Sequence, residues 1–260
     1  MKPLTALLIV AGSCLCWASP AFAQVRNVET IRSSLAAEGF GGSFDASITS
    51  YRGNTRGSLF GGSLLAGASG GSHLAYLNAV GAYSHLAGEV QVARWFVHAR
   101  YNYTLSDFAW GEFFAQAEAD RLQSLAIRQL VGFGPRVAVA QAKEGAAYVG
   151  AAHMFEFNKL RSDIVPVRPN WVQRLSTYLA LVWEQPIGVD DKVTVSTTGY
   201  FQPRYTKLSD FRVLWVSSLD FTVGNRLTAG VQATFKHESP VADSVRKGDL
   251  TFANTLGLKF

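Results

Sequence analysis

Apolar and polar residues alternate along nearly the whole chain after residue 39. Between residues 210 and 223, for example, Phe211, Val213 and Leu219 share one parity, while Arg212 and Asp220 share the other. Successive side chains of a β-strand point to opposite faces, so this period of two predicts strands with one apolar and one polar face. Turn residues separate the runs, and the sequence predicts twelve strands, at residues 40–51, 56–68, 73–87, 90–105, 109–120, 125–140, 145–158, 171–185, 191–205, 210–223, 226–238 and 249–260.

The length of these runs separates two all-β folds. A soluble β-sandwich also alternates, but a typical strand has about five or six residues, whereas many runs here have about 12 to 16. At about 3.3 Å per residue and a tilt near 40°, a run of about 12 residues rises roughly 30 Å, the thickness of a bilayer core. Trp171 and Trp183 stand near the two ends of one run, as interfacial aromatic residues do. The pattern therefore predicts a closed antiparallel transmembrane β-barrel of about 12 strands over residues 40–260, with its apolar face toward lipid.

The first 23 residues have the features of a secretory signal peptide. Lys2 supplies the positive charge, residues 4–10 the apolar stretch, and Ala21-Phe22-Ala23 a small-x-small cleavage site, so we expect cleavage near Ala23 and export to the outer membrane of a Gram-negative cell. Cys14 and Cys16 lie in the removed part, which leaves the mature chain without disulfide bonds or thiolate metal ligands.

The charge of the mature chain is small and scattered. Loss of Lys2 leaves 24 − 1 = 23 basic residues against 19 acidic ones, a formal charge of +4. No run of Lys and Arg is present, so the sequence gives no indication of a nucleic-acid partner.

Residues 24–39 are expected to form a short periplasmic segment. Val28, Ile31, Arg32 and Leu35 recur at roughly helical spacing. Two alternatives remain open: a short helix that rests on the barrel mouth or enters it as a partial plug, and a frayed linker. An even strand number places both termini on the periplasmic side, so the longer connections at 159–170 and 239–248 fall on the outer side.

The chain ends in an alternating strand whose last residue is aromatic. Leu256, Leu258 and Phe260 share the parity expected to face lipid. We expect this last strand to pair with the first, because an open sheet edge in hydrocarbon leaves backbone groups without hydrogen bonds. These three residues are also expected to act as the signal that the barrel-insertion machinery recognises, although Gly257 lies two residues later than the usual glycine of such a signal.

Three segments resemble the DUF481 outer-membrane proteins of Gram-negative bacteria, some of which are described as salt-induced. These segments are Gly42 followed by SFDASITSYRGNT, the central FAQAEADRLQSLAIRQLVGFGPRV, and the ending SPVADSVRKGDLTFANTLGLKF. The chain departs from the family pattern at His237-Glu238-Ser239, before Pro240. The resemblance implies a barrel in the outer membrane, and it implies little about activity because the activity of the family is poorly defined.

The inward parity contains a mixed set of charged side chains. We predict that the lumen is lined by Arg94, His98, Arg100, Glu112, Glu118, Asp120, Arg128, Arg136, Glu156, Arg174, Glu184, Arg212 and Asp220. One interpretation is a narrow channel for small, anionic solutes, or an envelope-adaptation protein. The alternative is a closed structural barrel, in which the same residues form ion pairs across the lumen.

A lipid-modifying hydrolase is a second alternative. His237 and Ser239 share the lipid-facing parity near the outer end of one strand, an arrangement in which a His can activate a Ser nucleophile. Pro240 follows directly and no residue is placed to orient the His, so we expect no enzyme. The five histidines are scattered, and neither a metal site nor a cofactor is expected. The expected partners are outer-membrane lipid, the insertion machinery and small anionic solutes.

Overall fold

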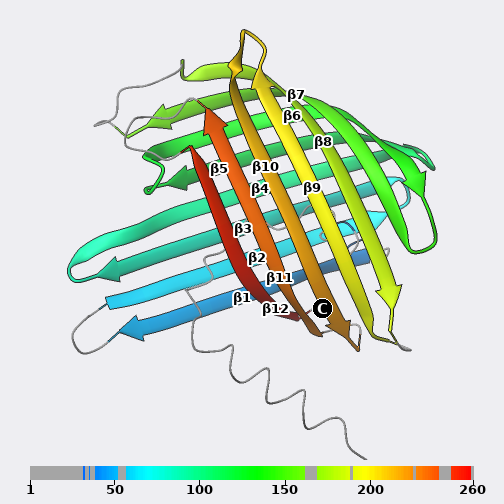
Figure 1. Ribbon diagram of the computed structural model, residues 1–260, viewed down its shortest axis with the longest axis horizontal. Helices are drawn as coiled ribbons and strands as arrows, with labels where there is room; N and C mark the ends of the chain where they lie inside the picture. Colours follow the sequence, from blue (N-terminus) through cyan, green and yellow to red (C-terminus); the bar gives the residue numbers. More distant parts are fainter. Residues whose placement is uncertain are drawn as a thin grey trace, which may run out of the picture.

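The computed structural model consists of one antiparallel sheet of twelve strands, joined in sequence order from β1 to β12 (Figure 1). The structure describes Arg32, Leu35 and residues 39–51, 57–161, 169–187, 190–224, 227–239 and 247–258. The strands are β1 (Gly39–Tyr51), β2 (Gly57–Gly70), β3 (His73–Leu86), β4 (Glu89–Ser106), β5 (Ala109–Asp120), β6 (Leu125–Gln141), β7 (Gly145–Leu160), β8 (Trp171–Pro186), β9 (Lys192–Arg204), β10 (Lys207–Val223), β11 (Leu227–Ser239) and β12 (Gly248–Leu258). The all-β class and the twelve predicted strands are confirmed, with boundaries shifted by a few residues at most. No helix in these described ranges is both long and apolar enough to cross a membrane.

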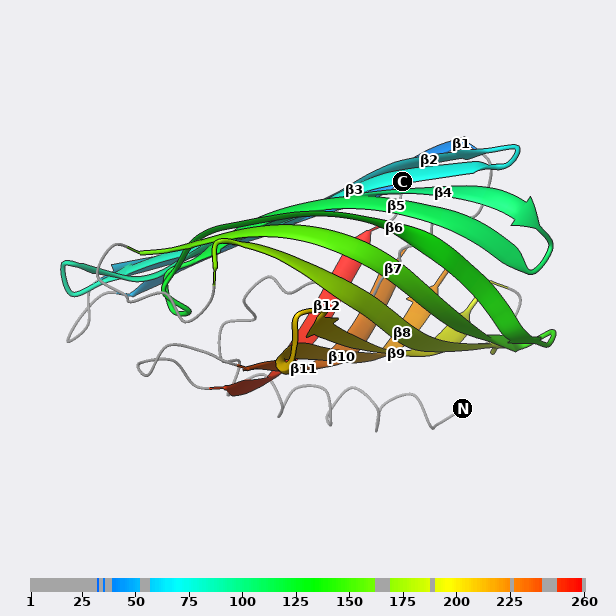
Figure 2. The ribbon, with the colours of Figure 1, turned by 90° about the horizontal axis from the view of Figure 1, so that it is seen from above.

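The sheet curls strongly, so that strands far apart in sequence face each other across its concave side (Figure 2). β1 and β12 approach to within 8 Å between Cα atoms. Within the described residues, hydrogen-bonded ladders join each strand to its sequence neighbours, and none joins β1 to β12. The structure thus has twelve antiparallel strands in a curled half-barrel, and closure between β12 and β1 stays a prediction.

Apolar residues lie on the convex face of the sheet and polar residues on the concave face, as the alternation of residue types predicted. On the convex face, Phe40, Phe44 and Ile48 of β1 and Phe252 of β12 are 65–73% exposed. On the concave face, polar residues such as Arg212 and Asp220 of β10 are buried. Soluble monomers rarely expose apolar patches above a few hundred Å², so a convex face of this kind requires an apolar covering.

The concave face is apolar at mid-depth, where the sequence analysis expected charged residues throughout. Phe96 of β4, Leu130 of β6, Met154 of β7 and Val216 of β10 are buried there. They share the parity of the inward charged residues, so the alternation itself is correct. The interior therefore has an apolar belt with charged residues on either side of it.

Leu35 belongs to the interior of the fold. It is helical and buried, and it packs with Leu65 of β2 and with Leu74 and Tyr76 of β3. The neighbouring helical residue Arg32 is also buried on the concave side. The rest of residues 24–38, like the signal peptide at 1–23, lies outside the described residues, and both alternatives for this segment stay predictions.

One predicted turn is wrong. The strands predicted at 191–205 and 210–223 left residues 206–209 as their connection, but β10 already begins at Lys207. The β9–β10 ladder shifts register between Lys207 and Phe211, so the extra residues are accommodated in an irregular strand end. Asp210 keeps the inward parity of Arg212 at this strand end and is buried.

Candidate functional site

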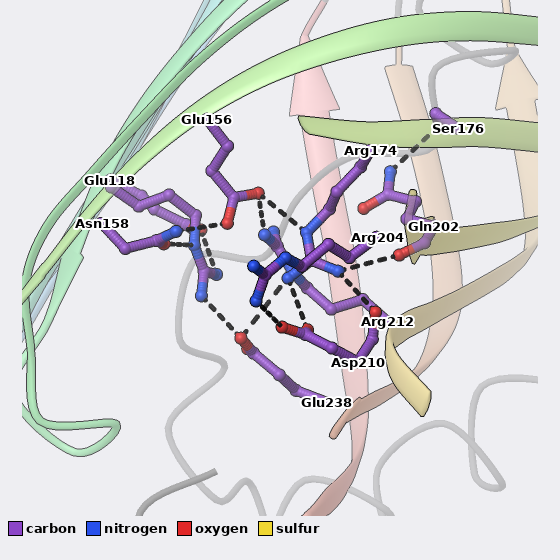
Figure 3. Close-up of polar contacts among 11 residues, drawn as sticks. Glu118, Glu156, Asn158, Arg174, Ser176, Gln202, Arg204, Asp210, Arg212 and Glu238 are labelled. Atoms are coloured by element: carbon purple, nitrogen blue, oxygen red, sulfur yellow. Dashed lines mark hydrogen bonds and ion pairs between the residues drawn. The ribbon is translucent and has the colours of Figure 1, made fainter. Parts of the chain in front are cut away.

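Eight charged residues form a continuous ion-pair chain at one end of the interior (Figure 3). Each lies near the end of its strand that leads to the connections at 121–124, 161–170, 205–206 or 240–247. Basic and acidic residues alternate along the chain, in the order Glu118, Arg128, Glu238, Arg212, Glu156, Arg174, Asp210 and Arg204. We refer to these eight residues as the ion-pair chain.

Arg128 of β6 joins two opposite parts of the sheet. Its Nη1 atom lies 2.9 Å from Glu118 Oε1 on the adjacent β5, and its Nη2 atom lies 2.8 Å from Glu238 Oε1 on β11. Its Nε atom donates to Asn158 Oδ1 at 2.7 Å. Because β6 and β11 are five strands apart in the sheet, the bond to Glu238 crosses the interior.

Arg212 of β10 makes a second crossing. Its guanidinium is hydrogen-bonded to Glu156 Oε2 on β7, and its Nε atom lies 3.7 Å from Glu238 Oε1. Asn158 donates to the other carboxylate oxygen of Glu156. Glu156 therefore has partners on both oxygens while its side chain is fully buried.

Arg174 of β8 is fully enclosed, with 0% of its surface exposed, like Glu156. Its Nη2 atom lies 2.7 Å from Asp210 Oδ1, and Nη1 donates to the backbone oxygens of Asp210 and Gln202 at 3.0 and 3.2 Å. Its Nε atom lies 3.4 Å from Glu156 Oε2. Buried charges are costly unless they are paired and hydrogen-bonded, and Arg174 meets both conditions.

A second group of polar residues lies deeper, toward the opposite strand ends, and we call it the Glu112 cluster. Glu112 of β5 is paired with Arg32 and with Arg100 of β4, whose Nη1 atom lies 3.3 Å from Glu112 Oε2. Tyr178 of β8 donates from its hydroxyl to the same carboxylate at 3.0 Å. Arg32 also donates to Asn102 Oδ1 at 3.4 Å. The cluster thus ties the segment before β1 to the walls of the half-barrel.

Arg136 of β6 lies at the same end as the Glu112 cluster, against aromatic rings. Its guanidinium carbon lies 3.7 Å from the ring centroid of Tyr148 and 5.4 Å from that of Trp110. Cation–π contacts of this kind stabilise a desolvated guanidinium. Arg136 is buried in this position.

The remaining residues that were predicted to line the lumen lie outside these two groups. His98 is buried beside Arg100, whose Nε atom lies 3.3 Å from His98 Nε2. Arg94 and Asp120 lie opposite each other in the β4–β5 ladder. Asp220 is buried near the C-terminal end of β10. Glu184 is at the rim, partly exposed, with Lys192 Nζ at 2.8 Å.

Sequence reasoning missed several members of these groups. Arg204, Asp210 and Glu238 of the ion-pair chain were not among the predicted lumen residues, nor were Asn158 and Tyr178. All five have the inward parity of their strands. Applying the alternation to every residue of each strand, the strand ends and the uncharged polar residues included, would have identified them.

The predicted insertion signal can be placed only in part. Leu256 and Leu258 lie in β12, opposite Ala229 and Leu227 of β11, but their side chains are outside the described residues. Phe260 lies outside the described residues altogether. The role of these three residues stays a prediction.

His237 and Ser239, the residues of the hydrolase alternative, lie at the end of β11 and are partly exposed. The ring of His237 stacks on Phe211 of β10, with centroids 5.4 Å apart. Among the described residues, no group of three or more His, Cys, Asp and Glu is arranged to hold a metal ion.

A cavity of about 160 Å³ separates the ion-pair chain from the Glu112 cluster. Members of both groups line it, together with the apolar belt at mid-depth. The interior therefore has three layers: a charged chain near one end, an apolar chamber, and a polar cluster near the other end.

Comparisons with known proteins give one family match and several distant structural likenesses. The family model described as "Protein of unknown function, DUF481" matches residues 44–260. No curated protein matches the sequence. The translocator domain of autotransporter NalP from Neisseria meningitidis is 12% identical, with a TM-score of 0.48, over 99% of this chain and 96% of that one. The NanC porin is 9% identical, with a TM-score of 0.46, over 85% of this chain and 97% of that one. A bacterial polysaccharide outer membrane secretin is 9% identical, with a TM-score of 0.46, over 85% of this chain and 95% of that one.

Proposed function

The chain belongs to the DUF481 family, and we propose that it is an outer-membrane β-barrel that forms a channel for small solutes and is shut at rest. Support for the membrane comes from the exposed apolar convex face, with Trp171 and Trp183 exposed near the two ends of β8. The strands are long enough to cross a bilayer core when tilted. In this proposal the signal peptide at 1–23 directs export, and outer-membrane lipid and the insertion machinery are the partners.

The observation that carries the shut state is the bond between Arg128 and Glu238, at 2.8 Å across the interior. Together with the pair of Arg212 and Glu156, it places guanidinium and carboxylate groups where a solute would pass. An open pore lined with charges needs its charges against the wall, in contact with water. Here they are bonded to each other and buried, which favours a closed resting lumen over the open-channel interpretation of the sequence.

Closure of the barrel between β1 and β12 is part of the proposal. An open edge in hydrocarbon would leave backbone groups unpaired at several kcal/mol each. The test uses cysteine pairs, since the sequence after residue 23 contains no cysteine. One cysteine replaces Phe44, and a second replaces Leu250, Phe252 or Asn254 in turn. In vesicles under mild oxidation, a closed barrel gives one strongly preferred cross-link, whereas an open sheet gives none.

Single-channel recording in planar bilayers tests the shut state. We expect the wild-type protein to show no steady conductance. Arg128→Ala with Glu238→Ala removes one crossing pair while keeping the net charge, and we expect this variant to conduct, if necessary together with Arg32→Ala in the Glu112 cluster. Lys192→Ala with Glu184→Ala removes a neutral pair at the rim and is the matched control, which should stay shut.

The outcomes separate the candidates. Steady wild-type conductance would mean that the ion-pair chain does not close the lumen, and the open channel would be the better description. If the variant that lacks both the Arg128–Glu238 pair and Arg32 still does not conduct, the protein is better described as a closed structural barrel. If conductance appears, the reversal potential in a salt gradient measures the anion preference that the sequence analysis predicted.

A further inference from the structure

The chamber between the ion-pair chain and the Glu112 cluster has the size of a site for one small ring. Its volume is about 160 Å³, and an apolar cavity of about 150 Å³ is known to hold benzene. Phe96, Phe114, Leu130, Met154 and Val216 contribute apolar surface to its wall. These side chains come from β4, β5, β6, β7 and β10, so apolar residues line the chamber from opposite parts of the sheet.

Glycines shape the aromatic part of this wall. A Cβ atom at Gly132 would lie 2.4 Å from the Phe114 ring, and one at Gly150 would lie 2.1 Å from the Tyr178 ring. The absence of side chains at these two positions lets both rings lie close to the sheet. The space beyond the rings is thereby kept open, and ring positions fixed in advance lower the entropy that a ligand must lose on binding.

Asn78 of β3 is a neutral polar residue of this chamber whose amide oxygen has no hydrogen bond among the described residues. It lines the cavity and is 2% exposed, and its Oδ1 atom has no hydrogen-bond partner among the described residues. It lies opposite His98 in the β3–β4 ladder, and His98 lies opposite Gln116 in the β4–β5 ladder. A buried acceptor without a donor is costly, and buried polar groups in native proteins are almost always satisfied by protein, water or a ligand.

The three arginines that line the chamber are engaged elsewhere, and its two lysines, Lys236 and Lys247, lie where β11 and β12 meet the connection at 240–247. Arg100 is bonded to Glu112, Arg128 to Glu118 and Glu238, and Arg212 to Glu156. A charged ligand would have to compete with these pairs, whereas a neutral one would not. The site therefore suits a neutral molecule with one hydrogen-bond donor.

We propose that this chamber binds a small neutral ring compound, apolar over most of its surface, whose hydroxyl or amide N–H donates to Asn78 Oδ1. The inference concerns occupancy of the interior, and it holds whether the barrel conducts or stays shut. The apolar belt selects an apolar ring, and the amide oxygen of Asn78 selects a hydrogen-bond donor on that ring.

The test compares 4-fluorophenol with 4-fluoroanisole, in which a methyl group replaces the hydroxyl hydrogen. Binding is followed by fluorine NMR titration of the full-length mature protein in detergent micelles, with empty micelles as the blank. We expect the phenol to bind about tenfold more tightly than the ether, because only the phenol can satisfy the amide oxygen. Asn78→Leu should remove this preference, and Asn254→Leu, the same change on the exposed convex face, should keep it.

Filling the chamber is the second arm of the experiment. Ala152 lies in the wall, and Ala152→Leu should weaken binding of both probes at least tenfold. Val216→Phe provides an independent filling variant from the opposite wall, and circular dichroism confirms that each variant is folded. Equal affinities of the two probes for the wild type would overturn the proposal, as would equal effects of Asn78→Leu and Asn254→Leu. The proposal would also be overturned if Ala152→Leu and Val216→Phe, both folded, bound the probes as well as the wild type does. If the wild type bound neither probe, the chamber would be assigned to water alone.

Discussion

Replacing Arg174 by methionine should destabilise the protein more than any comparable change at the rim. The substitution keeps much of the side-chain volume but removes the bonds to Asp210 Oδ1 at 2.7 Å and to two backbone oxygens at 3.0 and 3.2 Å. It also removes the Nε contact with Glu156 at 3.4 Å. Asp210 keeps Arg204 at 3.7 Å, which is a weaker partner. Breaking a buried ion pair on one side costs about 3–5 kcal/mol, and we expect a loss in this range.

The double variant Arg174→Met with Asp210→Asn separates the energy of the Arg174–Asp210 pair from that of the other contacts these residues make. Removing both charges leaves no uncompensated carboxylate at this position, so the double variant should be more stable than Arg174→Met by about 1–2 kcal/mol. Urea unfolding from phospholipid vesicles, followed by tryptophan fluorescence, measures the free energy of unfolding of each variant.

Lys192→Met is the matched control for this measurement. It removes a cation whose pair with Glu184 has side chains 30% and 39% exposed, and exposed pairs contribute about 0–1 kcal/mol. The reasoning would be refuted if Arg174→Met cost no more than Lys192→Met. It would also be refuted if Asp210→Asn added its full cost on top of Arg174→Met, since the two residues would then be independent.

Three further changes test other parts of the structure. Leu219→Arg, on the convex face at mid-strand, should lower the free energy of unfolding from vesicles by about 2–4 kcal/mol if this face meets lipid; a negligible loss would place it elsewhere. Gly150→Ala should displace the Tyr178 ring and cost about 1–3 kcal/mol, whereas Gly81→Ala, where a Cβ meets no atom within 4 Å, should cost less than about 1 kcal/mol in the same urea assay. Leu35→Ala should cost about 2–3 kcal/mol because the side chain is buried, and a neutral result would mean that it does not contribute to the interior.

The strands could be predicted because alternation is a local property of the sequence. In β10 the burial of side chains alternates along most of the strand, with Arg212 inside and Phe221 outside, as the order of residue types requires. The length of the runs then distinguished them from strands of a soluble sandwich. Neither inference depends on which strands face each other across the interior.

The partners inside the barrel could not be predicted in the same way. The parity of Arg128 and Glu238 places both side chains on the concave face, but their contact depends on how tightly the sheet curls. Curl is set by the packing of all strands together, so no short stretch of sequence encodes the pairing. The inward position of Asp210 follows from alternation, but its contact with Arg174 of β8 depends on the same curl.

The apolar belt was missed for a different reason. Leu130 and Met154 have the same parity as Arg128 and Glu156, only one position further along each inward row. Attention to charged residues alone gave a lumen that is polar from end to end. From the ion-pair chain toward mid-depth, the inward residues of β6 and β7 are first charged and then apolar. This order predicts an apolar region in the middle of the interior, where the chamber lies.

The balance of charge in the ion-pair chain has a consequence for selectivity. Four guanidinium groups and four carboxylates give a net charge of 4 − 4 = 0. A ring of one sign attracts the opposite ion over the range of a Debye length, but an alternating chain cancels its own field within a few ångströms. If this end of the lumen opens, it should therefore admit solutes by size more than by charge. An anion preference would have to originate from residues outside the chain, and Glu238→Gln, which leaves one uncompensated cation, should create or strengthen it.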